Sequence, residues 1–300
     1  MILKIYGLLS YDAVNVGLQD LAMGVDFLKD NAKASNIPLI SANIIDKKNK
    51  KTLFQPYIIK EIAGAKFGIF GLTSDSRIRK YFKNNINNIE ILPPMDTAKK
   101  IVKELKAKGI NVIIALSNLG YGNDIKLAKN VSGINFIVES WSYLRLNYPR
   151  KVDKSFILSP HFKGQYIGKL SIFLKSGAYN FYNPQQEKVL KVRIKGYEAQ
   201  MKYYRRLAKG MDPAEYFKND KKRLWSINKL KKLIEDTKKE LEEHTMAKKR
   251  GDVSIIHNEL FAMQLSLPED KEIKKIIKRL NPKIEALLPP KEKKGKERRR

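Results

Sequence analysis

The chain has 300 residues, 43% of them hydrophobic, which is enough for one large domain or two modest ones with a real core. It contains no cysteine, which excludes disulfides, thiolate zinc sites, cysteine nucleophiles and haem attachment through a C-x-x-C-H motif. Its three histidines leave little for a histidine-based metal cluster. The formal net charge of +29 fits nucleic acid, an anionic surface or an acidic protein as partner, and also fits a merely solvated, lysine-rich surface.

Two features of the sequence bear on location. No stretch approaches ~18 consecutive apolar residues, so no transmembrane segment is expected. The opening stretch Met1–Ser10 turns polar too soon for a signal peptide, which predicts a cytoplasmic protein for the chain as it stands. A signal peptide encoded upstream of Met1 would instead make the protein periplasmic.

Residues 1–178 alternate between short apolar runs and amphipathic stretches. Because predicted strands and helices alternate, an α/β fold built in layers is expected. Amphipathic patterns over Leu21–Ser35 and Met95–Lys108 predict helices, and Gly109 is a typical end for the second. The segment Tyr57–Leu72 predicts an antiparallel hairpin, so the sheet should be mixed. Strands are predicted over Ala13–Val16, Leu39–Ala42, Tyr57–Ile62, Lys66–Leu72, Val112–Ser117, Phe136–Glu139, Phe156–Ser159 and Gly168–Leu174.

Residues 182–288 have a different pattern, typical of a helical, coiled-coil-like extension. Apolar residues recur at spacings of three and four on Lys/Glu-rich helices, which predicts a long antiparallel helical hairpin. An apolar connector is expected at Val253–Leu267, followed by a third helix from about Pro268 that Pro282 kinks or breaks. Residues 289–300 form a basic tail that we expect to be disordered. The seam expected to bind a protein partner or a second copy is Ile227, Leu230, Ile234 and Leu241.

Six segments, in order, carry a family resemblance. One of them, Val131–Tyr143, resembles V-P-G-I-D-V-I-V-G-G-H-S-H, and another, Ile113–Gly120, resembles I-I-A-L-S-H-L-G. The others are Tyr11–Gly24, Pro38–Ile44, Phe54–Thr73 and Gly164–Leu170. Together they resemble the 5′-nucleotidase-like (calcineurin-like) metallophosphoesterases. The resemblance implies part of their mixed β-sandwich flanked by helices.

The same resemblance implies a site that two divalent metals occupy in active members of the family. The asparagine ligand of the family's G-N-H-E motif corresponds to Leu18, and the catalytic histidine beside it to Gln19. The ligand histidine of S-H-L-G corresponds to Asn118. The two histidines of G-H-S-H correspond to Trp141 and Tyr143, which could pack into the vacated site. Only Asp20 and Asn118 keep groups that could touch a cation, so no cofactor is expected.

The family's opening segment, with its D-x-H ligands, has no counterpart after Met1. We therefore expect the family domain to be incomplete at its N-terminus, with the missing part encoded upstream or supplied by another chain. A branch of the family has similarly altered metal loops and a helical extension, and some of its members continue into multihaem cytochromes. The segment Asn258–Leu287 resembles that extension.

Three hypotheses for function remain open. The first is a metallophosphoesterase-like pseudoenzyme that acts as a scaffold or binding module. The second is an active phosphohydrolase, such as a nucleotide 5′-phosphatase, that uses Mn²⁺, Zn²⁺ or Mg²⁺. The third is a basic protein that binds polyanions.

Overall fold

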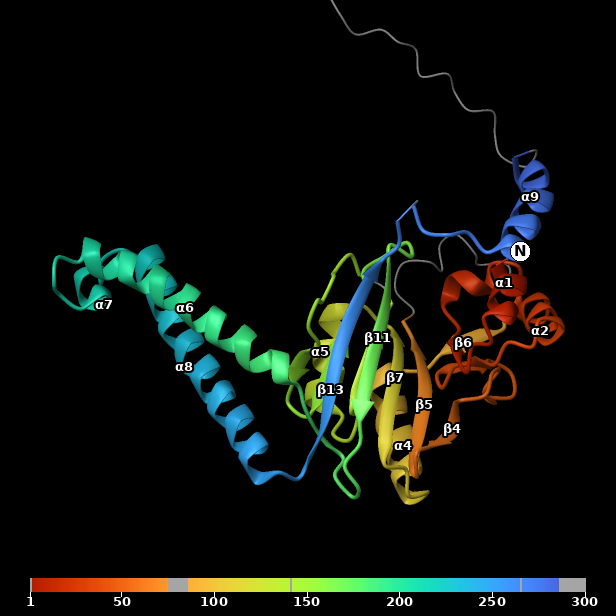
Figure 1. Cartoon of the computed structure of the whole chain (residues 1–300), viewed down its shortest axis with the longest axis horizontal. Helices are drawn as coiled ribbons and strands as arrows, with labels where there is room; N and C mark the ends of the chain where they lie inside the picture. Colours follow the sequence, from red (N-terminus) through yellow and green to blue (C-terminus); the bar gives the residue numbers. More distant parts are fainter. Residues whose placement is uncertain (1, 75–85, 141, 265, 286–300) are drawn as a thin grey trace, which may run out of the picture.

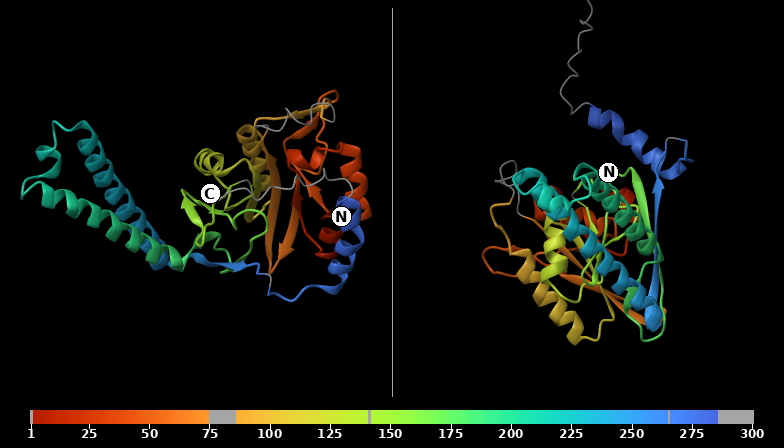
Figure 2. Two further views of the ribbon diagram at one scale, coloured as in Figure 1. Left: turned by 90° about the horizontal axis from the view of Figure 1, so that it is seen from above. Right: turned by 90° about the vertical axis from the view of Figure 1, so that its left-hand side faces the viewer.

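The computed structural model describes residues 2–74, 86–140, 142–264 and 266–285 (Figure 1). It shows two stacked sheets with helices on the outside and a long helical hairpin that extends away from them (Figures 1 and 2). This mixed α/β arrangement, with its antiparallel helical hairpin, confirms the predicted fold class. None of the helices in these described ranges is long and apolar enough to cross a bilayer.

The main sheet has six strands in the order β4-β5-β7-β8-β10-β9. Neighbouring strands of the β5-β7-β8-β10 centre run parallel, and the edge strands β4 and β9 are antiparallel to their neighbours. The predicted Tyr57–Leu72 hairpin is therefore confirmed as β4 and β5. Parallel strands covered on both faces need continuous apolar runs, which explains the sequence of the central strands. The strands are β4 Tyr57–Ile62, β5 Ala65–Thr73, β7 Val112–Asn118, β8 Phe136–Glu139, β9 Arg150–Val152 and β10 Ser155–Leu158.

Two helices cover one face of this sheet. They are α4 (Pro94–Ala107) and α5 (Tyr121–Asn130), and their apolar sides pack into one core with β5, β7 and β8. Proline at the first position of α4 suits a helix start, because the amide it lacks would have no partner there. Gly109 follows the helix with φ of 69°, a left-handed conformation that glycine adopts at little cost.

A three-stranded sheet, in the order β11-β13-β12, covers part of the other face. Its strands are β11 (Tyr166–Phe173), β12 (Asn180–Tyr182) and β13 (Val253–Ala262). The prediction of an apolar connector at Val253–Leu267 is wrong for residues 253–262. These residues form β13, the central strand of this sheet, which pairs with both β11 and β12. The chain thus leaves this sheet after β12, forms the helical hairpin and returns to the same sheet.

The N-terminal region has short elements. The predicted helix Leu21–Ser35 is shorter than expected: a 3₁₀ turn, η1 (Leu18–Leu21), precedes α2 (Val25–Ala34), with Gly24 at φ 92° between them. Two further pairs of strands, β1 with β2 and β3 with β6, complete this region. The remaining bounds are α1 Ile2–Leu8, β1 Val14–Asn15, β2 Leu39–Ile40, β3 Ile44–Asp46 and β6 Ile89–Ile91.

The hairpin consists of α6 (Pro184–Leu207), the short α7 (Pro213–Tyr216) and α8 (Lys221–Arg250). Asn183 caps α6, since its side chain accepts a hydrogen bond from the backbone amide of Gln185 at 3.0 Å. The third predicted helix is present as α9 (Lys271–Glu285), and it continues past Pro282 instead of breaking there. The predicted basic tail, residues 289–300, lies outside the described residues.

Candidate functional site

The candidate site lies where the parallel strands of the main sheet end. Thr73 of β5 is in register with Asn118 of β7, and Ser117 of β7 with Glu139 of β8. The loops that follow these strands therefore meet at one edge of the sheet. In open α/β sheets this carboxyl edge is where ligands commonly bind. Asn118 ends β7 at this edge, and three further residues of the sequence-predicted site, Leu18, Gln19 and Asp20, lie in the η1 turn beside it.

The structure brings Asp20 and Asn118 together. A Cβ atom on Gly17 would lie 3.5 Å from Asn118 Oδ1 and 3.5 Å from Asp20 Oδ2, so the two oxygens are at most about 7 Å apart. The Gly17 amide donates a hydrogen bond to Asp20 Oδ2 at 2.8 Å. Asn118 Nδ2 points the other way, toward Ser140 Oγ at 3.4 Å. Both side chains thus keep an oxygen near one point of the site.

The surroundings of Asp20 change the proton affinity of its carboxyl group. Asp20 is exposed to solvent, but the protein atoms around its carboxyl group partly desolvate it and raise its pKa; the Gly17 hydrogen bond acts in the opposite direction. The nearby Tyr6 of α1 also has a raised pKa, mainly from burial and then from Tyr11 and Asp20. A metal ion would have to displace this proton, so any binding by Asp20 would weaken as the pH falls.

The other family positions carry side chains unsuited to metal. Leu18 is 3% exposed and packs in a hydrophobic cluster with Val16 and Leu21, while Gln19 is exposed to solvent. Tyr143 is 79% exposed and contacts Phe162 edge-on, so it does not fill the vacated site as expected. Trp141 lies outside the described residues.

A buried acidic network that the sequence did not reveal lies directly beneath Asn118. Asp124, in the first turn of α5, accepts a hydrogen bond at Oδ1 from Ser117, while its Oδ2 is buried with no partner among the described residues. Glu139 is buried too, and Oε2 accepts hydrogen bonds from Ser142 at 2.8 Å and Ser159 at 2.7 Å. An acidic residue at the end of an apolar strand, such as Glu139, was the available signal.

This network changes the proton affinity of Asp124. Burial raises its pKa to about 7, the hydrogen bond from Ser117 lowers it, and the charge of Glu139 raises it again. An acid with this pKa can exchange protons near neutral pH. Asp124 is fully buried, however, so it does not face the space between Asp20 and Asn118 as a general base would have to.

The described residues do not fit a two-metal centre. No group of three or more His, Cys, Asp or Glu side chains placed to hold a metal ion occurs among them. The carboxylate of Asp20 and the amide of Asn118 alone would leave a divalent ion mostly hydrated. We therefore derive no catalytic step through a metal at this edge.

The predicted partner-binding seam is used within the chain. Ile227 and Leu230 are buried against Met201 and Phe217 in the core of the hairpin, and Ile234 and Leu241 are half-buried. At Ile227 and Leu230 the heptad pattern is thus satisfied by the pairing of α8 with α6, whereas binding of a protein partner or a second copy through the seam stays a prediction.

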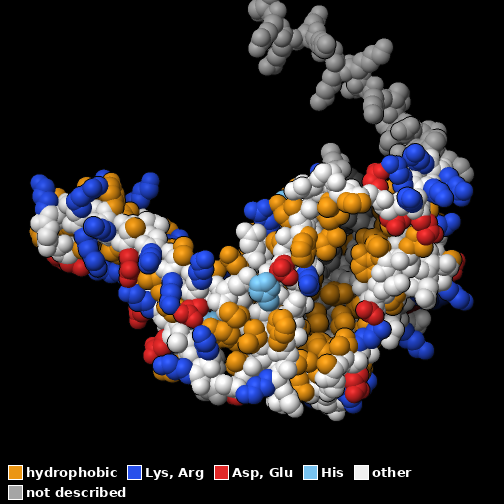
Figure 3. Space-filling view, viewed as in Figure 1, with side chains coloured by type: hydrophobic (Ala, Val, Ile, Leu, Met, Phe, Trp, Pro, Cys, Tyr) orange, Lys and Arg blue, Asp and Glu red, His pale blue; other side chains and the backbone are white. Residues whose placement is uncertain are grey.

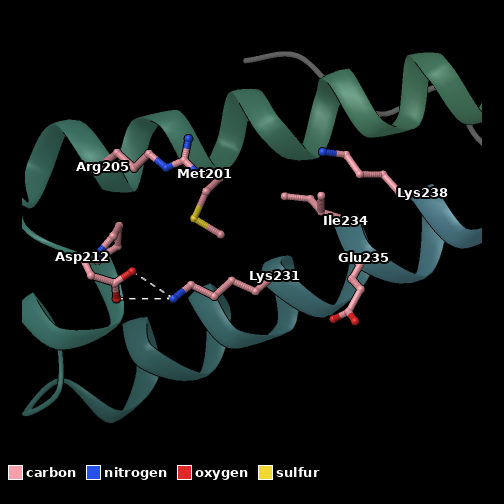
Figure 4. A pocket seen from close by; sticks show the side chains of 8 residues that line it. Met201, Arg205, Asp212, Lys231, Ile234, Glu235 and Lys238 are labelled. Carbon is pink, nitrogen blue, oxygen red and sulfur yellow. Dashed lines mark hydrogen bonds and ion pairs between the residues drawn. The ribbon is translucent and has the colours of Figure 1, made fainter.

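A cavity of about 360 Å³ opens beside this core, between α6 and α8 (Figure 4). Lys231 Nζ lies 3.3 Å and 3.1 Å from the two carboxylate oxygens of Asp212 at its rim. Its lining holds no histidine, cysteine or serine that could act as a nucleophile. The lining residues are Met201, Arg205, Asp212, Pro213, Lys231, Ile234, Glu235 and Lys238.

Comparison with known proteins shows that part of the chain is similar to 5′-nucleotidases. No protein-family model matches the chain. The protein UshA of Yersinia enterocolitica is 32% identical over 127 residues, which cover 42% of this chain and 23% of that protein. A 5′-nucleotidase of Vibrio parahaemolyticus is 27% identical over 199 residues, which cover 56% of this chain and 36% of that protein. Over the segment that it shares with these relatives, the chain is related to the 5′-nucleotidase-like metallophosphoesterases.

A solved structure agrees with this nucleotidase-like assignment at the level of the fold. The calcineurin-like phosphoesterase YfkN of Bacillus subtilis superposes with a TM-score of 0.52 at 22% identity, covering 59% of this chain and 62% of that one. The chain spans only about a quarter to a third of the length of the two nucleotidase-like relatives named above. The similarity therefore covers only part of this chain and only part of each relative.

Proposed function

We propose that this nucleotidase-like protein does not hydrolyse phosphate esters and acts as a scaffold or binding module. The observation that carries the proposal is Leu18, a side chain without a donor atom that is buried in the core at the position of a metal ligand. Replacing Leu18 by a metal-binding side chain would place a polar group in this hydrophobic cluster, and the cluster would have to repack around it. The solvent-exposed Tyr143 at a second ligand position adds support.

The second candidate function is a metal-dependent phosphohydrolase, and the convergence of Asp20 and Asn118 favours it. Its substrates would be those of the named relatives, nucleotide 5′-phosphates. The metal would be Mn²⁺, Zn²⁺ or Mg²⁺, held by these two residues and by groups outside the described ones. This candidate and the first differ in one measurable property, which is turnover that depends on a metal ion.

The test measures hydrolysis of bis(p-nitrophenyl) phosphate and of AMP by the full chain with each of the three metals. We expect rates at the background of buffer and metal alone, and no change on adding a chelator. An active 5′-nucleotidase assayed in parallel shows that the conditions support catalysis. Turnover that a chelator abolishes, and that Asp20→Ala removes while the exposed control Asp30→Ala does not, would establish the hydrolase instead.

A further inference from the structure

The end of the helical hairpin that is remote from the sheets combines positive charge with exposed aromatic side chains. We define the hairpin tip as residues 201–232: the last two turns of α6, α7, the first turns of α8 and the loops between them. Because α6 starts just after β12 and α8 ends just before β13, the tip is the part of the hairpin farthest from the sheets (Figure 1). At 1.5 Å per residue, the 24 residues of α6 carry it roughly 36 Å outward.

The hairpin tip is strongly basic. Its 32 residues include eleven Lys or Arg and three Asp or Glu, a formal charge of +8 out of +29 for the whole chain. Each of the three acidic residues is already in an ion pair: Asp212 with Lys231, Glu215 with Lys218 and Asp220 with Arg223. Lys and Arg side chains are spread over this end of the molecule, between hydrophobic and other side chains, in the space-filling view (Figure 3). Such a surface is complementary to an anionic one.

The tip also exposes large side chains that the hairpin core does not use. Tyr203, Met211, Tyr216 and Trp225 are 43% to 63% exposed, and they come from α6, the α6–α7 loop, α7 and α8. The core of the hairpin is filled instead by other residues, among them Met201, Phe217, Ile227 and Leu230. Four separate segments therefore present an apolar or aromatic side chain at the same end of the hairpin.

We propose that the hairpin tip docks on an anionic lipid surface. The exposed tyrosines, tryptophan and methionine would enter the headgroup region, where amphipathic rings are favoured, while the surrounding cations contact lipid phosphates. This inference goes beyond the function proposed above and does not depend on the state of the nucleotidase-like site.

Two observations favour a lipid surface over nucleic acid. Sequence-independent binding of a single strand uses a groove with open aromatic faces on which bases stack. Here Lys229 Nζ lies over the Trp225 ring at 4.6 Å, and the Arg206 guanidinium lies 5.7 Å from the Tyr203 ring, so one face of each ring already holds a cation. The exposed side chains sit on a projecting helical end, and Met211 has no π face to offer a base.

The experiment is cosedimentation of the full chain with vesicles of phosphatidylcholine alone and with about one third phosphatidylglycerol. Binding is expected only to the anionic vesicles and should fall steeply with added salt, because the attraction is screened. The chain has two tryptophans, so a Trp141→Phe background leaves Trp225 as the sole reporter. Its emission should shift to shorter wavelength on binding, as expected for a ring that leaves water.

Matched variants test the location of the surface. Changing Lys221, Lys222 and Lys229 to Gln should weaken vesicle binding about tenfold or more. Changing Lys99, Lys100 and Lys103 of α4, which are also exposed, to Gln should weaken it less than about threefold. Tyr203→Ala with Trp225→Ala should weaken binding several-fold at unchanged charge, whereas Met23→Ala with Phe27→Ala in the other part of the chain should not. Circular dichroism shows whether each variant keeps its helices.

The proposal fails if folded wild-type chain does not bind the anionic vesicles. It also fails if the tip variants and their controls bind alike, or if the Trp225 emission does not move. A single-stranded RNA is included as a separate arm. Binding of the RNA through the same lysines without binding to vesicles would make the tip a nucleic-acid site and overturn the lipid assignment.

Discussion

Replacing Asp124 by Asn is expected to stabilise the folded chain more at pH 8 than at pH 4, by up to about 4 kcal/mol. Asp124 is fully buried, its Oδ2 has no partner among the described residues, and burial raises its pKa from 3.8 to about 7. In the unfolded chain the same carboxyl group titrates near its ordinary value. Each pKa unit of difference corresponds to ~1.4 kcal/mol, which gives the expected size.

The direction follows from proton binding. Between about pH 4 and pH 7 the folded state keeps the Asp124 proton that the unfolded state has released. The stability that this proton supplies is therefore complete below about pH 4, is lost as pH rises toward 7, and stays lost above that. Asparagine resembles the protonated acid at every pH, so the variant does not undergo this loss.

The measurement is urea unfolding of the wild type and of Asp124→Asn at a series of pH values, with the difference in unfolding free energy plotted against pH. Taking the difference removes titrations that both proteins share, such as that of the buried His244, whose lowered pKa produces the opposite trend. The exposed Asp30→Asn is the matched control for the loss of one carboxyl group. A flat line for Asp124→Asn would show that the folded state does not hold this proton.

The features of the site differ in how far they could be predicted from sequence. Leu18, Gln19 and Asn118 stand inside recognisable motifs, so their chemistry was readable without a structure. The buried acidic network of Asp124 and Glu139 could not be predicted from the sequence, because segments distant in the chain bury these side chains. Ser159, for example, lies just after β10 and hydrogen-bonds to Glu139, which is 20 residues earlier in the chain. Polar residues that look ordinary in sequence become unusual only when the fold removes their water.

The fold divides in a similar way. The parallel core strands and the helical hairpin have strong local patterns, so their existence was predictable. The pairing of residues 253–262 as strand β13 could not be predicted. Its partner strand β11 lies about 90 positions earlier in the chain, and no local signal specifies that pairing. The heptad seam shows the same limitation, since an apolar stripe on a helix does not say whether its partner is in the same chain.

Replacing Ile256 by Ala is expected to lower the free energy of unfolding by about 2–5 kcal/mol, whereas Ile255→Ala should lower it by less than about 1 kcal/mol. These neighbours on β13 face opposite ways. Ile256 is fully buried in the core between the two sheets, paired in register with Ile172, while Ile255 pairs with Phe173 on the outer face and is 44% exposed. Removing the buried side chain leaves a cavity, and removing the exposed one does not.

Urea unfolding followed by circular dichroism gives both free energies. The pair is a strict comparison because the residue type, the substitution and the strand are the same, and only the face differs. If residues 253–262 were a connector on the surface, the two variants would lose similar and small amounts of stability. Equal losses would therefore argue against β13 as part of the sandwich. A large loss for Ile256→Ala alone would show that the segment after the hairpin completes the core between the two sheets. The hairpin would then be anchored in the three-stranded sheet at both ends.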